Sequence, residues 1–77
     1  MRNLSLIIDE LLAAIPATET VTRQRLESVK GKLGYTAPEV MRGRWAEVES
    51  ILCDLTSPYG EPRPDWLLNA LKVWNGN

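Results

Sequence analysis

The sequence contains no histidine, and its single cysteine is Cys53. Without histidine the commonest general base of enzymes is missing, and a zinc site of the usual Cys/His kind cannot be assembled. One cysteine also excludes a disulfide within the chain. We therefore expect a protein that is not an enzyme and that holds no metal or cofactor, and we interpret Cys53 as an incidental free thiol.

Long apolar runs and a strong net charge are also missing. The 77 residues carry a net charge of −1, which does not favour binding to polyanions by bulk electrostatics. The first apolar segment contains Asp9 and Glu10, is too short to cross a bilayer, and lacks the basic lead-in of a signal peptide. Together with the free thiol, these features predict a cytoplasmic protein.

Apolar residues recur with the period of an α-helix in four segments. They predict helices over about residues 4–15, 20–33, 37–55 and 65–74. No segment alternates with the period of a strand. We therefore expect an all-α, four-helix bundle-like fold that forms one domain over residues 1–77. A domain of this size needs support, and self-association is the favoured source because disulfides and zinc are excluded.

The start of the third predicted helix has the clearest local signal. Thr36 and Glu39 have the spacing of a capping box, in which each side chain satisfies a free backbone N–H of the other. Tyr35 and Val40 are spaced for the hydrophobic staple that accompanies such a box. Pro38 in the first turn loses no helical hydrogen bond.

Basic residues are concentrated in residues 22–44, which hold six of them against two acidic residues. The order of basic helix, glycine-containing turn and second helix is similar to that of a helix-turn-helix. Two positions depart from that pattern: Lys30 stands where a small residue is needed, and Gly43 stands where an apolar side chain is needed. The segment is therefore interpreted as a DNA-binding surface, as a surface for an acidic partner, or as a solvated basic face. Its candidate contact residues are Arg23, Arg25, Lys30, Lys32, Arg42 and Arg44.

Arg44 falls within the apolar arc of the third predicted helix. A buried guanidinium without a partner costs several kcal/mol, so something must resolve its charge. We consider three solutions: a carboxylate on another helix, exposure of that end of the helix, or an acidic group of a binding partner.

The last predicted helix is apolar over more of its circumference than a helix docked on one side of a bundle requires. Tryptophan is also the commonest anchor type in binding hot spots. The pattern predicts an interface with a second copy or with another protein, unless this helix is simply the central one of the bundle. The predicted interface residues are Trp66, Leu67, Ala70, Leu71 and Trp74.

These observations predict a small protein-binding module, a homodimeric regulator or inhibitor of a protein partner. The alternative is a small DNA-binding transcriptional regulator that uses residues 22–44. A scaffold role without a regulated target is a third interpretation.

Overall fold

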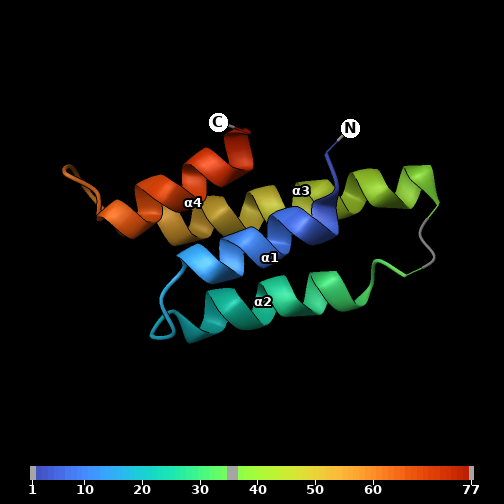
Figure 1. Ribbon diagram of the computed structural model, residues 1–77, viewed down its shortest axis with the longest axis horizontal. Coiled ribbons are helices and arrows are strands. Elements are labelled where there is room, and N and C mark those ends of the chain that lie inside the picture. Colours follow the sequence, from blue (N-terminus) through green and yellow to red (C-terminus); the bar gives the residue numbers. More distant parts are fainter. Residues whose placement is uncertain (1, 35–36, 77) are drawn as a thin grey trace.

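A computed structural model of the chain describes residues 2–34 and 37–76. Within these residues it contains four α-helices and no strand (Figure 1), which confirms the predicted all-α fold. The helices are α1 (Leu4–Ala14), α2 (Thr20–Gly31), α3 (Pro38–Thr56) and α4 (Asp65–Asn75). None of the helices in this part of the chain combines the length and the apolar character needed to span a membrane.

The ends of the helices follow from the residues found there. Ile15 is extended (φ −84°, ψ 127°) and ends α1, because the proline that follows it disfavours a helical conformation. The helix α2 ends at Gly31, two residues earlier than predicted, and the N–H groups of Lys32 and Leu33 bond three residues back at 3.0 and 3.1 Å. Gly76 closes α4 in the left-handed conformation, at φ 83°.

At the start of α3, Ala37 occupies the cap position directly before Pro38. Its main-chain carbonyl accepts a hydrogen bond from the Met41 N–H at 2.9 Å, whereas its methyl side chain offers no acceptor. Tyr35 and Thr36 lie outside the described residues. The predicted capping box and hydrophobic staple, which depend on those two residues, therefore stay predictions.

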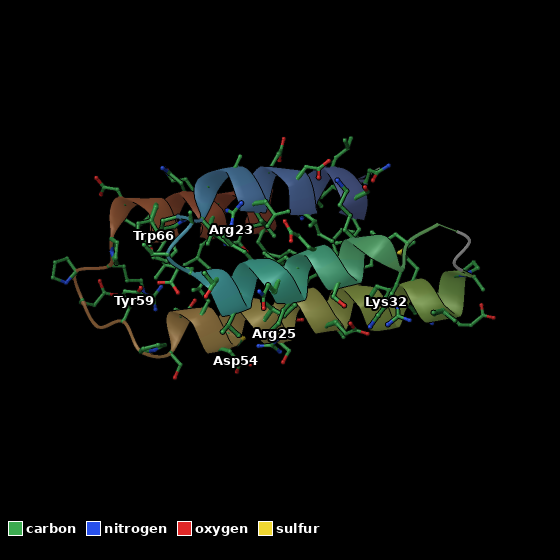
Figure 2. All side chains as sticks on the ribbon, turned by 90° about the horizontal axis from the view of Figure 1, so that it is seen from below. Arg23, Arg25, Lys32, Asp54, Tyr59 and Trp66 are labelled. Atoms are coloured by element: carbon green, nitrogen blue, oxygen red, sulfur yellow. The ribbon has the colours of Figure 1, made fainter. Side chains whose placement is uncertain are left out.

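Consecutive helices run in opposite directions, so the chain passes up and down four times (Figure 1). The closest helix pairs are α1 with α4 and α2 with α3, and α1 also packs against α2. In Figure 2, α1 and α4 form one layer above a second layer made of α2 and α3.

Every helix contributes apolar side chains to one core between these layers. Ile8, Leu11, Leu26, Val48 and Leu67 have no exposed surface. Each of them lies on the periodic apolar face of its helix, which is the pattern expected when helices are held together by burial of one stripe each.

Tyr59 fixes the loop between α3 and α4 to the loop between α1 and α2, which lies at the same end of the molecule (Figure 1). Its hydroxyl donates a hydrogen bond to the Glu19 carboxylate at 2.6 Å, next to the start of α2. Its ring stacks edge-on against Trp66 of α4, with 5.6 Å between ring centroids. The loop also contains a cis peptide bond between Glu61 and Pro62.

Candidate protein-binding groove between α3 and α4

The helices α3 and α4 are neighbours along the chain, yet their backbones approach each other less closely than those of α1 and α4. Large aromatic rings lie along the seam between them. Trp45 of α3 meets Trp74 of α4 with 5.5 Å between ring centroids, and Tyr59 meets Trp66 at the other end. Side chains of this size hold two helix axes apart, because the interaxial distance follows the side chains at the contact.

The space left between these helices is an open groove of about 510 Å³, which we call the α3/α4 groove. Leu52, Leu71 and Trp74 provide its apolar surface, of which Leu52 is buried and the other two are half-buried. The complete lining is Glu49, Leu52, Cys53, Thr56, Ser57, Tyr59, Arg63, Leu71, Trp74 and Asn75.

The two ends of the α3/α4 groove carry opposite charges. Glu49 lies at the end near Asn75, because α3 and α4 are antiparallel, whereas Arg63 lies at the end where α4 begins. The Arg63 Nε is shielded from solvent and has no hydrogen-bond partner among the described residues; the nearest carboxylate oxygen, on Glu61, is 3.8 Å away. Buried N–H groups usually have a partner; because this Nε is shielded, the groove presents the positive charge of the Arg63 guanidinium rather than a free Nε–H donor.

The predicted interface residues of α4 divide between the core and this groove. Leu67 and Ala70 are fully buried within the chain's own core, so they have no surface to offer a partner and the prediction does not hold for these two. Leu71 and Trp74 line the groove, and Trp66 packs half-buried beside Tyr59. The rest of the predicted interface stays a prediction.

One residue that matters for this face was not among the predicted interface residues. Leu68 is 44% exposed, one turn before Leu71 on the same side of α4. The sequence placed it within the broad apolar arc of this helix. It did not show which edge of that arc faces solvent, because that depends on where α1 and α3 lie.

Most of the predicted basic contact residues have partners within the chain. The Arg23 guanidinium donates to the carbonyl oxygens of Leu12 and Ile15 at 2.5 and 2.6 Å. Arg25 forms an ion pair with Asp54 at 2.9 Å. Lys30 is paired with Asp9. The acidic neighbours of α1 and α3 thus offset much of the basic charge of α2.

Arg44 is also paired, in a way that differs from the three solutions considered for it. Its guanidinium bonds to the Glu47 carboxylate one turn along the same helix, rather than to a carboxylate on another helix. The side chain is 23% exposed, and its Nε, like that of Arg63, is shielded from solvent without a hydrogen-bond partner among the described residues.

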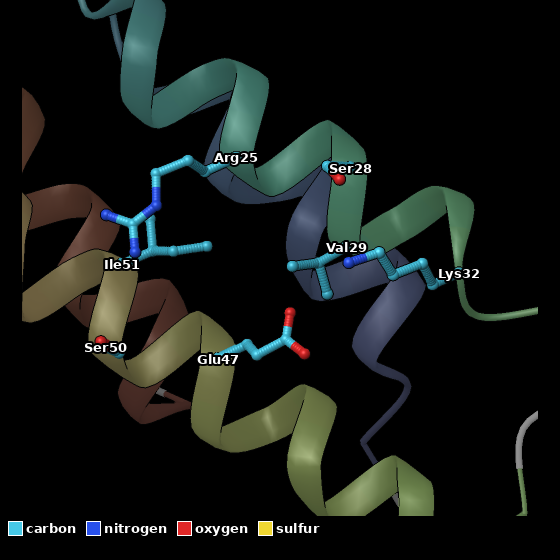
Figure 3. Close-up of a pocket in the computed structure, with 7 residues that line it drawn as sticks. All are labelled: Arg25, Ser28, Val29, Lys32, Glu47, Ser50 and Ile51. Atoms are coloured by element: carbon cyan, nitrogen blue, oxygen red, sulfur yellow. The ribbon is translucent and has the colours of Figure 1, made fainter.

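A second, smaller hollow of about 270 Å³ lies between α2 and α3. The Lys32 side chain and the Glu47 carboxylate both point into it, with Arg25 on its far side (Figure 3). Acidic and basic groups are mixed there. The hollow therefore does not present the uniform positive charge that a nucleic acid requires.

The relative direction of α2 and α3 differs from that of a helix-turn-helix. The two helices run antiparallel in both views (Figures 1 and 2), and they pack directly against each other. A helix-turn-helix instead crosses its helices at about 90–120°, so that the second one can enter the major groove. The pair is therefore an ordinary helical hairpin.

Few reactive groups occur among the residues that the structure describes. Cys53 is a free, exposed thiol on the wall of the α3/α4 groove. Among residues 2–34 and 37–76, no three side chains of the His, Cys, Asp or Glu type come together as a metal site would require.

Comparison with protein-family models, curated proteins and solved structures finds no match to this chain.

Proposed function

We propose that this chain is a non-enzymatic protein-binding module that regulates or inhibits a protein partner by holding an amphipathic helix in the α3/α4 groove. The observation that carries the proposal is the groove itself, an apolar trough with half-buried Leu71 and Trp74 on its surface. When a partner covers an apolar surface of this kind, the free energy falls because that surface leaves water.

A helix is the occupant that suits the groove best. Two antiparallel helices form its walls, and an amphipathic helix that lies in such a trough buries its apolar stripe against both. The charges at the two ends favour one direction. The N-terminus of the bound helix, with its partial positive charge, lies toward Glu49, and its C-terminus lies toward Arg63.

The internal pairing of Arg23, Arg25, Lys30 and Arg44 supports protein binding over DNA binding. A DNA-binding protein needs lysines and arginines that are able to displace counterions from phosphates. For the same module we propose a cytoplasmic location, because Cys53 is an exposed, unpaired thiol of the kind that reducing compartments preserve.

Site-specific photocrosslinking tests the groove. A photoreactive amino acid in place of Asn75 lies in the groove, whereas the same amino acid in place of Gln24 lies on the exposed surface of α2. In the native host we expect an adduct only from position 75, and we expect mass spectrometry to map it to a segment with helical apolar periodicity.

A pair of matched substitutions on α3 separates the groove from general surface effects. Cys53→Arg places a large charged side chain on the groove wall, and Ser50→Arg makes a change of similar size on the α2 side of the same helix. We expect the first to abolish the position-75 adduct and the second to preserve it. An adduct that forms equally from Gln24, or that survives Cys53→Arg, would contradict the proposal.

A further inference from the structure

The solvent-facing side of α4 carries three exposed residues in one row: Asp65, Leu68 and Lys72. They are three and four residues apart, so they lie one above another on the helix surface. Along the helix, the row therefore consists of an acidic, an apolar and a basic residue. It borders the α3/α4 groove, because Leu71 and Asn75 continue the adjacent row of α4 and line that groove.

This row is complementary to itself when a second copy of α4 lies antiparallel to the first. Asp65 and Lys72 flank Leu68 almost symmetrically, so a two-fold axis near Leu68 brings Asp65 of each copy opposite the partner's Lys72. The same axis brings the two Leu68 side chains together. The antiparallel direction also places the positive end of each helix dipole beside the negative end of the other.

We propose that the helix held by the α3/α4 groove is α4 of a second copy of this chain. This inference rests on the proposed function, since it names the occupant of the same groove. The two-fold axis places Leu68 of each copy against the partner's Leu68 and beside the partner's apolar surface around Leu71, so the same patch of both copies forms the contact, which is what an isologous dimer requires. The antiparallel direction also agrees with the one that Glu49 and Arg63 favour.

The dimer is expected to be weak and reversible. The row spans two turns of one short helix, and stable interfaces bury about 1,200–2,000 Å² in total. We expect a dissociation constant in the range of roughly 10 µM to 1 mM. A weak dimer of this kind protects the groove at high protein concentration and leaves it accessible to another helix when the copies separate.

Sedimentation equilibrium over roughly 10 µM to 1 mM protein tests the dimer directly. We expect concentration-dependent dimerisation of the wild type and at least a tenfold weaker association for Leu68→Glu. Val21→Glu is the matched control, because Val21 is an exposed apolar residue on α2, away from this face. Circular dichroism shows whether each variant retains its helices.

Charge reversal tests the direction of the two copies. Asp65→Lys alone and Lys72→Asp alone each place like charges opposite one another, so we expect each to weaken self-association roughly tenfold. A mixture of the two variants restores opposite charges at both contacts, and we expect it to form a heterodimer with about the wild-type affinity.

A wild-type chain that stays monomeric at the highest concentration overturns the inference. A dimer whose affinity is unchanged by Leu68→Glu also overturns it. The same holds if the mixture of the two charge variants associates no more strongly than either variant alone. The photocrosslink from position 75 distinguishes the two proposals. An adduct with a different protein and none with a second copy leaves the groove as a binding site but removes self-docking, whereas no position-specific adduct of either kind removes both.

Discussion

Two arginines use their guanidinium groups to satisfy main-chain carbonyls at the C-terminal ends of helices. Arg23 bonds to Leu12 and Ile15 at the end of α1, and Arg2 bonds to Val73 and Trp74 near the end of α4. The last carbonyls of a helix have no partner within it and carry a partial negative charge. An arginine from another segment therefore both caps the helix and ties two parts of the chain together.

Arg23→Met tests this role at the end of α1. The methionine keeps an apolar stem of similar length but cannot donate to the two carbonyls. We expect the free energy of unfolding to fall by about 1–2 kcal/mol, measured by chemical denaturation. Gln24→Met, at the exposed neighbouring position, should change stability by less than about 0.5 kcal/mol. Equal effects of the two substitutions would show that the carbonyl contacts contribute nothing.

Tyr59 predicts a dependence of stability on alkaline pH. Its hydrogen bond to the Glu19 carboxylate, together with burial and the repulsion between that carboxylate and a phenolate, raises the pKa of the phenol above 10.0. A raised pKa means that the stabilisation is fully present below pH 10.0 and is lost as the pH rises through the higher value of the folded protein.

The measurement compares the wild type with Tyr59→Phe by denaturation at a series of pH values. We expect the wild type to be the more stable of the two at neutral pH, and we expect the difference to shrink above pH 10.0. A difference that stayed constant across this range would mean that the Tyr59 hydroxyl does not act through its proton.

At the scale of the helix, a glycine has different effects inside α3 and at the end of α4. Gly43 lies inside α3, and a Cβ added there would meet nothing within 4 Å. Gly76 ends α4 at φ +83°, a conformation that other residues rarely adopt. One glycine therefore weakens its helix, whereas the other terminates its helix.

Gly43→Ala is expected to raise the free energy of unfolding by about 0.5–1 kcal/mol, because alanine loses less backbone entropy in a helix. Gly76→Ala should lower it by roughly 1–2 kcal/mol, because a side chain is strained in the left-handed region. Thermal unfolding of the two variants beside the wild type checks both signs. A loss of stability for Gly43→Ala would indicate that this face of α3 is covered.

The helices could be predicted from the sequence because each has a periodic apolar stripe that is visible locally. The sequence could not predict which apolar residues of α4 are buried in the core and which are exposed. Leu67 and Leu68 are adjacent leucines, yet the first is fully buried and the second is 44% exposed, because the position of the other helices decides which side is covered. The groove could not be predicted either. It depends on the distance between α3 and α4, and Trp45 and Trp74, which hold the helices apart there, are far apart in the sequence.

For the whole molecule, the basic charge of α2 is balanced by acidic residues of other helices rather than within α2 itself. The basic residues of α2 meet acidic residues of α1 and α3, as Lys30 meets Asp9 and Arg25 meets Asp54. These pairs are exposed, and an exposed ion pair contributes at most about 1 kcal/mol to stability. Their main consequence is electrostatic, since they reduce the positive potential that the sequence of α2 alone indicates.

This charge balance predicts that the protein does not bind duplex DNA. The test is a fluorescence-polarisation titration of a labelled duplex at a low salt concentration of about 50 mM, which favours phosphate contacts. We expect the polarisation of the duplex to stay unchanged as protein is added. Affinity that falls steeply with added salt and disappears when Arg42→Ala is combined with Arg44→Ala would contradict this expectation. That result would favour the regulator of transcription over the protein-binding module.

Cys53 gives this surface a built-in attachment point. The native sequence has only this one thiol, and it is exposed on the wall of the α3/α4 groove. A spin label or an environment-sensitive fluorophore can therefore be attached at a single known position without any mutation. The signal of such a probe would follow the filling and emptying of the groove in real time, whichever helix enters it.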